Sequence, residues 1–262
     1  MTTTATRPAP AAAATVAIGS TGTERRAWVR PLLAVIALLA MYGALSLLDD
    51  PRGTLGTDTG GKLATVRAMD DRGALDPDIG YWAEDRDPRG TLHPLWYTRH
   101  LGDRWVNVTT LPMPYAAVPL YHLGGERAVV LLPMLGALLA ALAARAIARR
   151  VSGERAGWPA FWAIGLATPV LVYALDFWEH AIGLAAMLWA LLLVLDVVDG
   201  RGGVRAAAGA GALIGFAATM RTEALVYGAI AVIVAGAILW RQRAPWRSVV
   251  SRAAAAGAAF LT

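Results

Sequence analysis

Five charged residues could do chemistry at one face of a membrane. They are Asp58, Asp176, Glu179, Arg221 and Glu223. Each lies close to the end of an apolar stretch, where charged side chains are costly to place and are often functional. A carboxylate can act as a general base, and an arginine can bind phosphate through charge-assisted hydrogen bonds. These residues therefore indicate proton transfer and anion binding at a water–lipid boundary.

The first acid, Asp58, lies in the segment Gly56-Thr-Asp-Thr-Gly-Gly-Lys62, shortly after the first apolar stretch. A carboxylate held at this place could take a proton from a hydroxyl group. Aspartate is also a favoured residue at the N-terminus of a helix, so Asp58 could instead cap the helix that follows. The residues alone leave both interpretations open.

The second pair of acids, Asp176 and Glu179, lies between two apolar stretches. A spacing of three places both carboxylates on one face of a helical turn. There they could bind a cation, orient an acceptor or supply the base. The alternative is a solvated hairpin whose tip requires polar residues. His180 follows directly and is a further candidate for substrate binding.

The pair Arg221 and Glu223 occupies a turn of only a few residues. Arg221 could hold a phosphate group, or the two side chains could form an ion pair that locks the turn. Lys62 and Arg67 are further phosphate candidates. Because they lie on an expected amphipathic surface helix, contact with lipid headgroups is the favoured interpretation for both.

Other chemistries have less support in the sequence. The chain has no cysteine, which excludes disulfides and thiolate chemistry. Its four histidines have no zinc-ligand spacing, and no motif requires a metal or a cofactor, although a divalent cation stays open. The net charge of +5 comes from arginines in short loops, so it does not indicate nucleic-acid binding.

The composition is that of a membrane protein. Of 262 residues, 56% are hydrophobic and 16% are charged, whereas soluble domains have about 25% charged residues. The sequence predicts an all-α, polytopic transmembrane bundle with about seven helices. The expected helices lie near Pro31–Leu48, Ala128–Ala146, Trp158–Leu175, Ala181–Val198, Ala206–Met220, Ala224–Trp240 and Val249–Thr262. The last is too short to span, which favours either a fragment of a longer protein or a terminal helix that does not cross.

Clusters of arginine assign the sides of the membrane. They are Arg7, Arg25, Arg26 and Arg30; Arg145, Arg149, Arg150 and Arg155; Arg201 and Arg205; and Arg241, Arg243, Arg247 and Arg252. All fall on the cytoplasmic side if the N-terminus is cytoplasmic, as the positive-inside rule expects for an inner (plasma) membrane. Residues 1–26 are then a disordered cytoplasmic tail, residues 27–262 form the membrane domain, and the five charged residues lie outside.

A long external loop, from about residue 49 to 127, follows the first apolar stretch. Gly60 to Arg72 predicts a short surface helix, with Leu63, Val66 and Met69 as an apolar stripe that faces the membrane. Residues 73–100 are rich in Gly, Pro and Asp and predict loop with interfacial aromatic residues. Residues 109–125 contain three prolines and predict an interfacial or re-entrant segment.

In these features the chain resembles the GT-C superfamily of polytopic glycosyltransferases. An acid (Asp58) follows the first helix, and a proline-rich segment (residues 111–119) precedes the second. A Pro-x-x-x-Tyr run, residues 169–173, leads to the acidic hairpin, and Gly215 precedes Arg221-Thr-Glu223. The similarity covers about residues 31–240. Many members have a second acid directly after the first, where this chain has Thr59.

The resemblance implies inverting transfer of a sugar from a polyprenyl-phosphate donor to an acceptor hydroxyl of a cell-envelope glycan or lipid. Asp58 would be the base, Asp176 or Glu179 the second acid, and Arg221 the phosphate-binding residue. Members of the superfamily have more helices and often a soluble C-terminal domain, so an inactive truncated enzyme is one alternative. The other is a non-enzymatic membrane protein, such as a transporter-like bundle or an assembly subunit.

Overall fold

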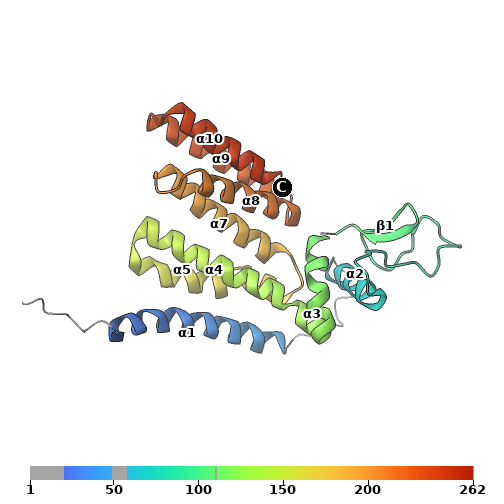
Figure 1. Ribbon diagram of the computed structural model, residues 1–262. Coiled ribbons are helices and arrows are strands. Elements are labelled where there is room, and N and C mark those ends of the chain that lie inside the picture. Colours follow the sequence, from blue (N-terminus) through green and yellow to red (C-terminus); the bar gives the residue numbers. More distant parts are fainter. Residues whose placement is uncertain (1–20, 49–57, 110, 262) are drawn as a thin grey trace, which may run out of the picture. The chain divides into compact units, whose positions relative to one another are not determined.

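The protein is built mainly from helices. The structure, a computed structural model, describes residues 21–48, 58–109 and 111–261 (Figure 1). Its helices are α1 (Thr21–Ser46), α2 (Asp58–Arg72), α3 (Pro112–Val129), α4 (Leu131–Ser152), α5 (Glu154–Leu166), α6 (Val170–Leu175), α7 (His180–Val198), α8 (Val204–Met220), α9 (Glu223–Arg241) and α10 (Trp246–Phe260). The chain divides into two units within α1, between Ala37 and Leu38.

Within the part of the chain that the structure describes, four helices are long and apolar enough to cross a membrane, which supports a membrane protein. They are residues Val29–Ser46 of α1, and α4, α7 and α9. Helix α8 is apolar but shorter. The expected helix at 158–175 is instead two pieces, α5 and α6, because Pro169 ends the first and begins the second. Helix α9 leaves Val226 and Ile233 exposed, as a lipid-facing helix does.

Most of the expected N-terminal tail, residues 1–20, lies outside the described residues, and helix α1 begins at Thr21. Further along the same helix, the Tyr42 hydroxyl donates to the carbonyl of Gly165 in α5 over 2.8 Å. Both Leu38 and Tyr42 are fully buried. This end of α1 is therefore anchored on α5.

The remaining long helices pack side by side. Helix α4 lies between α5 and α7, α8 packs on α7, and α10 packs on α8 (Figure 1). Glycine permits the closest approaches: a Cβ atom at Gly136 in α4 would lie 2.7 Å from the Ile182 nitrogen of α7. Gly211 in α8 meets the backbone of Ala256 in α10 in the same way. Small residues at such contacts are typical of membrane helices. The expected seventh segment, α10, thus lies along its neighbour.

The expected external loop folds into more structure than its sequence suggests. Helix α2 forms as expected, but its stripe does not face lipid: Leu63 and Val66 are buried with Met113 and Ala117 of α3. A neighbouring helix buries an apolar stripe as well as a membrane does, and here α3 covers the stripe. The proline-rich residues form α3, which is kinked at Gly125.

A β-hairpin corrects the prediction of an all-α fold. Strands β1 (Thr98–Leu101) and β2 (Arg104–Asn107) pair antiparallel through a two-residue turn, in which Gly102 takes a φ of 66°. Asn107 at the end of β2 is buried against Gly61 of α2, and its amide donates to the carbonyl of Trp96. Asn107 therefore anchors the hairpin lobe on α2.

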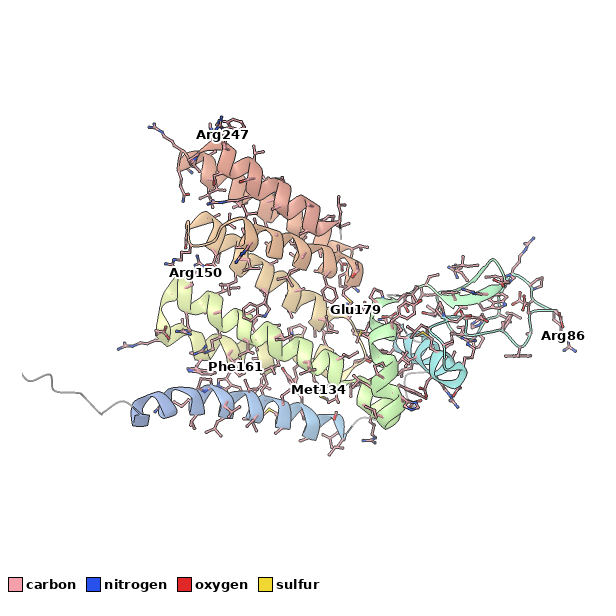
Figure 2. The ribbon with its side chains drawn as sticks, viewed as in Figure 1. Arg86, Met134, Arg150, Phe161, Glu179 and Arg247 are labelled. Carbon is pink, nitrogen blue, oxygen red and sulfur yellow. The ribbon has the colours of Figure 1, made fainter. Side chains whose placement is uncertain are left out.

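Arginine and aspartate side chains pair at one end of the helix pack. Arg150 at the end of α4 forms ion pairs with Asp196 and Asp199 near the end of α7. The hydrogen bond from Arg150 lowers the pKa of the Asp199 carboxyl. Arg150 and Arg247 lie at one end of the helices and Glu179 at the other (Figure 2). Arg150 and Arg247, from two of the arginine clusters, are thus separated from Glu179 by the length of the helices.

Candidate functional site

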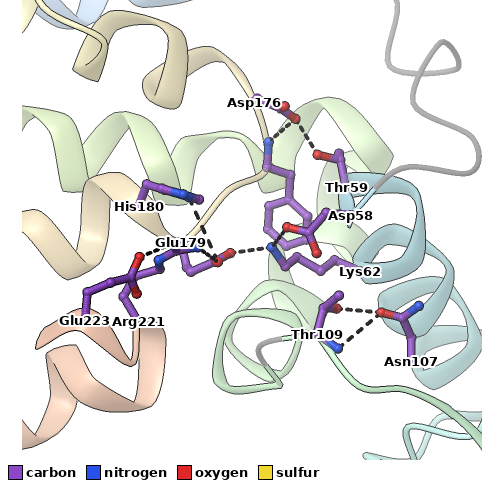
Figure 3. Close-up of polar contacts among 11 residues, drawn as sticks. Asp58, Thr59, Lys62, Asn107, Thr109, Asp176, Glu179, His180, Arg221 and Glu223 are labelled. Carbon is purple, nitrogen blue, oxygen red and sulfur yellow. Dashed lines mark hydrogen bonds and ion pairs between the residues drawn. The ribbon is translucent and has the colours of Figure 1, made fainter. Parts of the chain in front are cut away.

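A buried lysine joins two of the sequence-predicted acids. Helix α2 begins at Asp58, and one carboxylate oxygen of Asp58 accepts a hydrogen bond from Lys62 Nζ, one turn later, over 2.6 Å. The same ammonium donates to Glu179 Oε2, which precedes α7 (Figure 3). The Lys62 side chain is completely buried. Residues about 120 positions apart are therefore held by one cation.

The position of Lys62 corrects an expectation. Lys62 does not lie on a surface helix in contact with headgroups, because α2 packs against α3 and turns this side chain inward with Leu63 and Val66. A buried ammonium is stable only when it is paired, and Lys62 has two carboxylates. Arg67, on the opposite face of α2, remains 67% exposed.

Glu179 is the centre of the site. It is 2% exposed and accepts from Lys62 and, at 3.4 Å, from Arg221 Nη1. Burial alone would raise the pKa of Glu179, but the charge and hydrogen bond of Lys62, a backbone hydrogen bond and the neighbouring His180 together lower the pKa. Arg221 also donates to Glu223. Burial opposes the charge on Arg221, yet its hydrogen bonds to Glu223 and Glu179 raise its pKa, so the guanidinium stays charged.

Asp176 has a different partner from Glu179. It ends α6 in an extended conformation, and its Oδ1 accepts from the Thr59 hydroxyl and from its own neighbour, Phe177 N, both over 2.7 Å. The expectation that the two acids share one helical turn is therefore wrong, because the helix stops at Leu175. Asp176 thus links the connection between α6 and α7 to α2 through Thr59, which is the position that departs from the GT-C pattern.

An aromatic group beside the acids was not anticipated from the sequence. His180 begins α7, and its ring stacks on Tyr173 with centroids 4.5 Å apart and lies 5.1 Å from Trp178. The His180 Nδ1 atom is 4.0 Å from Glu179 Oε1. Within the part of the chain that the structure describes, Trp178 Nε1 and His180 Nδ1 are buried without a hydrogen-bond partner. Such nitrogens can serve a bound ligand. Tyr173 and Trp178, which lie on either side of Asp176 in the sequence, could have predicted this aromatic group.

The structure thus brings six of the seven sequence-predicted site residues into one network, and Asp176 lies beside it, bonded to Thr59 of the helix that carries Asp58 and Lys62. The network runs from Asp58 through Lys62 and Glu179 to Arg221 and Glu223, with His180 on its flank (Figure 3). Among residues 58–109 and 111–261, no group of three or more histidine or acidic side chains is arranged to hold a metal ion. The arrangement can hold a carboxylate in place for proton transfer and can present one arginine to an anion.

Comparison with protein-family models, with curated proteins and with solved structures finds no match to this chain.

Proposed function

We propose that the chain is a membrane-embedded glycosyltransferase that moves a sugar from a polyprenyl-phosphate donor to an acceptor hydroxyl with inversion. The observation that carries the proposal is the network in which buried Lys62 bridges Asp58 and Glu179 at one end of the apolar helices. Buried ionic groups at such a place are expensive, and a reaction at the lipid boundary would account for them. The GT-C resemblance supplies the reaction class by analogy.

Asp58 is the proposed base. Its Oδ2 atom is held by Lys62, while its side chain is 30% exposed, so the carboxylate is both fixed and accessible. In the reaction, the acceptor hydroxyl gives its proton to Asp58 as its oxygen bonds to the anomeric carbon. The bond from that carbon to the polyprenyl phosphate oxygen breaks at the same time, and the phosphate leaves with the electron pair.

Arg221 is the proposed partner of the departing phosphate. Its side chain is 35% exposed, and Glu179 and Glu223 fix its orientation. A guanidinium has five N–H donors, so it can bind a phosphate and its carboxylates together. An apolar groove of about 410 Å³ lies between α8, α9 and α10 and includes Leu225, two residues after Glu223. Its lining would suit a polyprenyl chain.

The proposal places the network on the external face, with the N-terminus in the cytoplasm and the helices in the inner (plasma) membrane as a polytopic bundle. Support comes from the arginines at the opposite end of the helices, including Arg150 and Arg247 (Figure 2), because basic residues favour the cytoplasmic side.

The test is Asp58→Asn, measured in membranes that contain the protein expressed from its complete coding sequence. Transfer of radiolabelled sugar from polyprenyl-phosphate mannose, glucose and arabinose is followed. Loss of a general base should reduce the rate by about 10²–10⁴-fold. The matched control is Asp103→Asn at the hairpin turn, whose side chain is 93% exposed. Equal rates in both variants, at equal membrane insertion, would show that Asp58 is not the base; no transfer by the parent protein from any donor would refute the enzyme.

A second candidate is a non-enzymatic membrane protein in which the same charges lock the helices. The observation in its favour is that Asp58, Asp176, Glu179 and Glu223 each have an internal partner, as a purely structural network requires. This candidate predicts that Asp58→Asn lowers stability without any change in a transfer reaction, because no reaction would exist.

A further inference from the structure

A pocket outside the helix pack lies on the exposed face of α2. Its floor is formed by Ala64, Arg67, Ala68 and Asp71, which recur at the spacing of one helix face, and its wall by residues 79–82 and 93–95. The volume is about 330 Å³, which is in the range of small-molecule sites. Because Ala64 and Ala68 are small, they leave space between α2 and the loop. The Lys62 network lies on the opposite, buried face of the helix.

Aromatic rings supply the apolar surface of the pocket. The Tyr81 ring is packed edge-on against Trp105, with centroids 4.9 Å apart, and its hydroxyl donates to Asp87 over 3.1 Å. His93 lies 4.7 Å from Tyr81. These contacts hold both rings in place. Trp82, by contrast, is 88% exposed. An exposed indole leaves a large apolar surface in contact with water, and a ligand stacked on the ring would cover that surface.

The polar groups of the pocket carry both signs of charge. Arg67 Nε and Asp71 Oδ2 are 3.8 Å apart, and the side chains are 67% and 69% exposed, so their remaining donors and acceptors face solvent. An anion would meet the Asp71 carboxylate, and a cation would meet Arg67. A hydroxyl group both donates and accepts, so neighbouring hydroxyls match a neighbouring donor and acceptor without any net charge.

We propose that this pocket binds a neutral saccharide unit, with the C–H face of the sugar on Trp82 and its hydroxyls on Arg67 and Asp71. The ligand class follows from two properties that occur together, an aromatic surface and a charge-balanced polar pair. A sugar ring has both an apolar face and a rim of hydroxyl groups. The binding itself does not depend on the proposed transferase.

If the transferase proposal holds, the pocket specifies the acceptor. Arg67 follows Asp58 by nine residues in α2, and a rise of about 1.5 Å per residue separates them by about 14 Å along the helix. A single sugar cannot fill the pocket and present a hydroxyl to Asp58. The acceptor is then an oligosaccharide or glycan polymer whose distal unit occupies the pocket.

The experiment measures binding without a donor. The full chain in lipid nanodiscs is mixed with methyl glycosides of glucose, mannose, galactose and arabinose and with the corresponding disaccharides, and saturation-transfer NMR identifies ligands and their affinities. We expect Trp82→Ala to weaken binding by about tenfold or more and Trp82→Phe to retain most of it. The matched control is Trp96→Ala, a tryptophan that is 71% exposed but does not line the pocket; it should bind as the parent does.

Two further arms separate the outcomes. Arg67→Gln should weaken saccharide binding in this assay, in which no transfer takes place, so that failure of the transferase and failure of the pocket are distinguishable. Asp103→Asn, at the exposed hairpin turn, should leave saccharide binding unchanged. Phosphocholine and glucuronic acid serve as charged probes. Absence of saccharide binding, equal binding by the two tryptophan variants, or preferential binding of phosphocholine would overturn the proposal; the last result would make Trp82 a contact for lipid headgroups.

Discussion

Replacement of Lys62 by methionine is the sharpest test of how the site is built. The change removes the ammonium but keeps a long apolar stem in a position that is fully buried. Glu179, which is 2% exposed, then keeps the 3.4 Å contact to Arg221, a hydrogen bond to its own backbone and its neighbour His180. Asp58 is 30% exposed and can turn to water. The cost therefore falls mainly on Glu179.

The magnitude follows from this asymmetry. Removal of one partner from a buried ion pair costs about 3–5 kcal/mol, because the remaining charge is uncompensated. Arg221 compensates part of the Glu179 charge, so we expect the lower end, about 3 kcal/mol. Glu179→Gln in the Lys62→Met background removes the unpaired charge. The double variant should therefore be about 1–3 kcal/mol more stable than the sum of the two single losses predicts.

The assay is thermal unfolding in lipid nanodiscs. For a domain of this size, 1 kcal/mol corresponds to about 2–4 °C in Tm, so Lys62→Met should unfold about 6–12 °C lower. Arg67→Met is the matched control on the same helix, with a side chain that is 67% exposed, and it should change stability by no more than about 0.5 kcal/mol. If both variants unfold at the same temperature, or if the effects of Lys62→Met and Glu179→Gln simply add, Lys62 does not bridge buried carboxylates.

Two further predictions concern acid and packing. The folded-state pKa of Glu179 is depressed, so its contribution to stability is present above the unfolded pKa of about 4.3 and is lost as pH falls through the lower folded pKa. In a pH series of Tm, Glu179→Gln should therefore reduce the fall of Tm at acid pH. An unchanged fall of Tm would assign the acid sensitivity to other carboxyl groups. Gly136→Ala should destabilise the α4–α7 contact by about 1–3 kcal/mol, because its Cβ would lie 2.7 Å from Ile182 N. The control is Gly43→Ala, whose Cβ would have no atom within 4 Å. Equal Tm values for the two variants would show that α4 and α7 are farther apart.

Hydrophobic pattern was sufficient to locate most of the helices. The segments expected at 181–198, 206–220 and 224–240 differ from α7, α8 and α9 by no more than two residues at either end, because apolar runs bounded by charged or glycine residues leave little choice. The same pattern failed at α5 and α6, where Pro169 divides one apolar run. It also missed the hairpin at 98–107, whose strands have four residues each and whose residues are mostly polar.

The site shows a different limit of sequence reasoning. Charges at helix ends were recognised one by one, and the structure brings six of the seven chosen residues into one network, with Asp176 beside it. Their pairing could not be predicted, because it depends on which face of α2 meets α3. With Leu63 and Val66 directed at lipid, Lys62 would be a headgroup contact; with the same stripe on α3, Lys62 becomes the cation between Asp58 and Glu179. The energetic consequence is large, since the same side chain changes from a solvated charge to one that is costly to leave unpaired. An apolar stripe thus predicts which face of a helix is buried, but the identity of the surface that buries it decides what the flanking charges do.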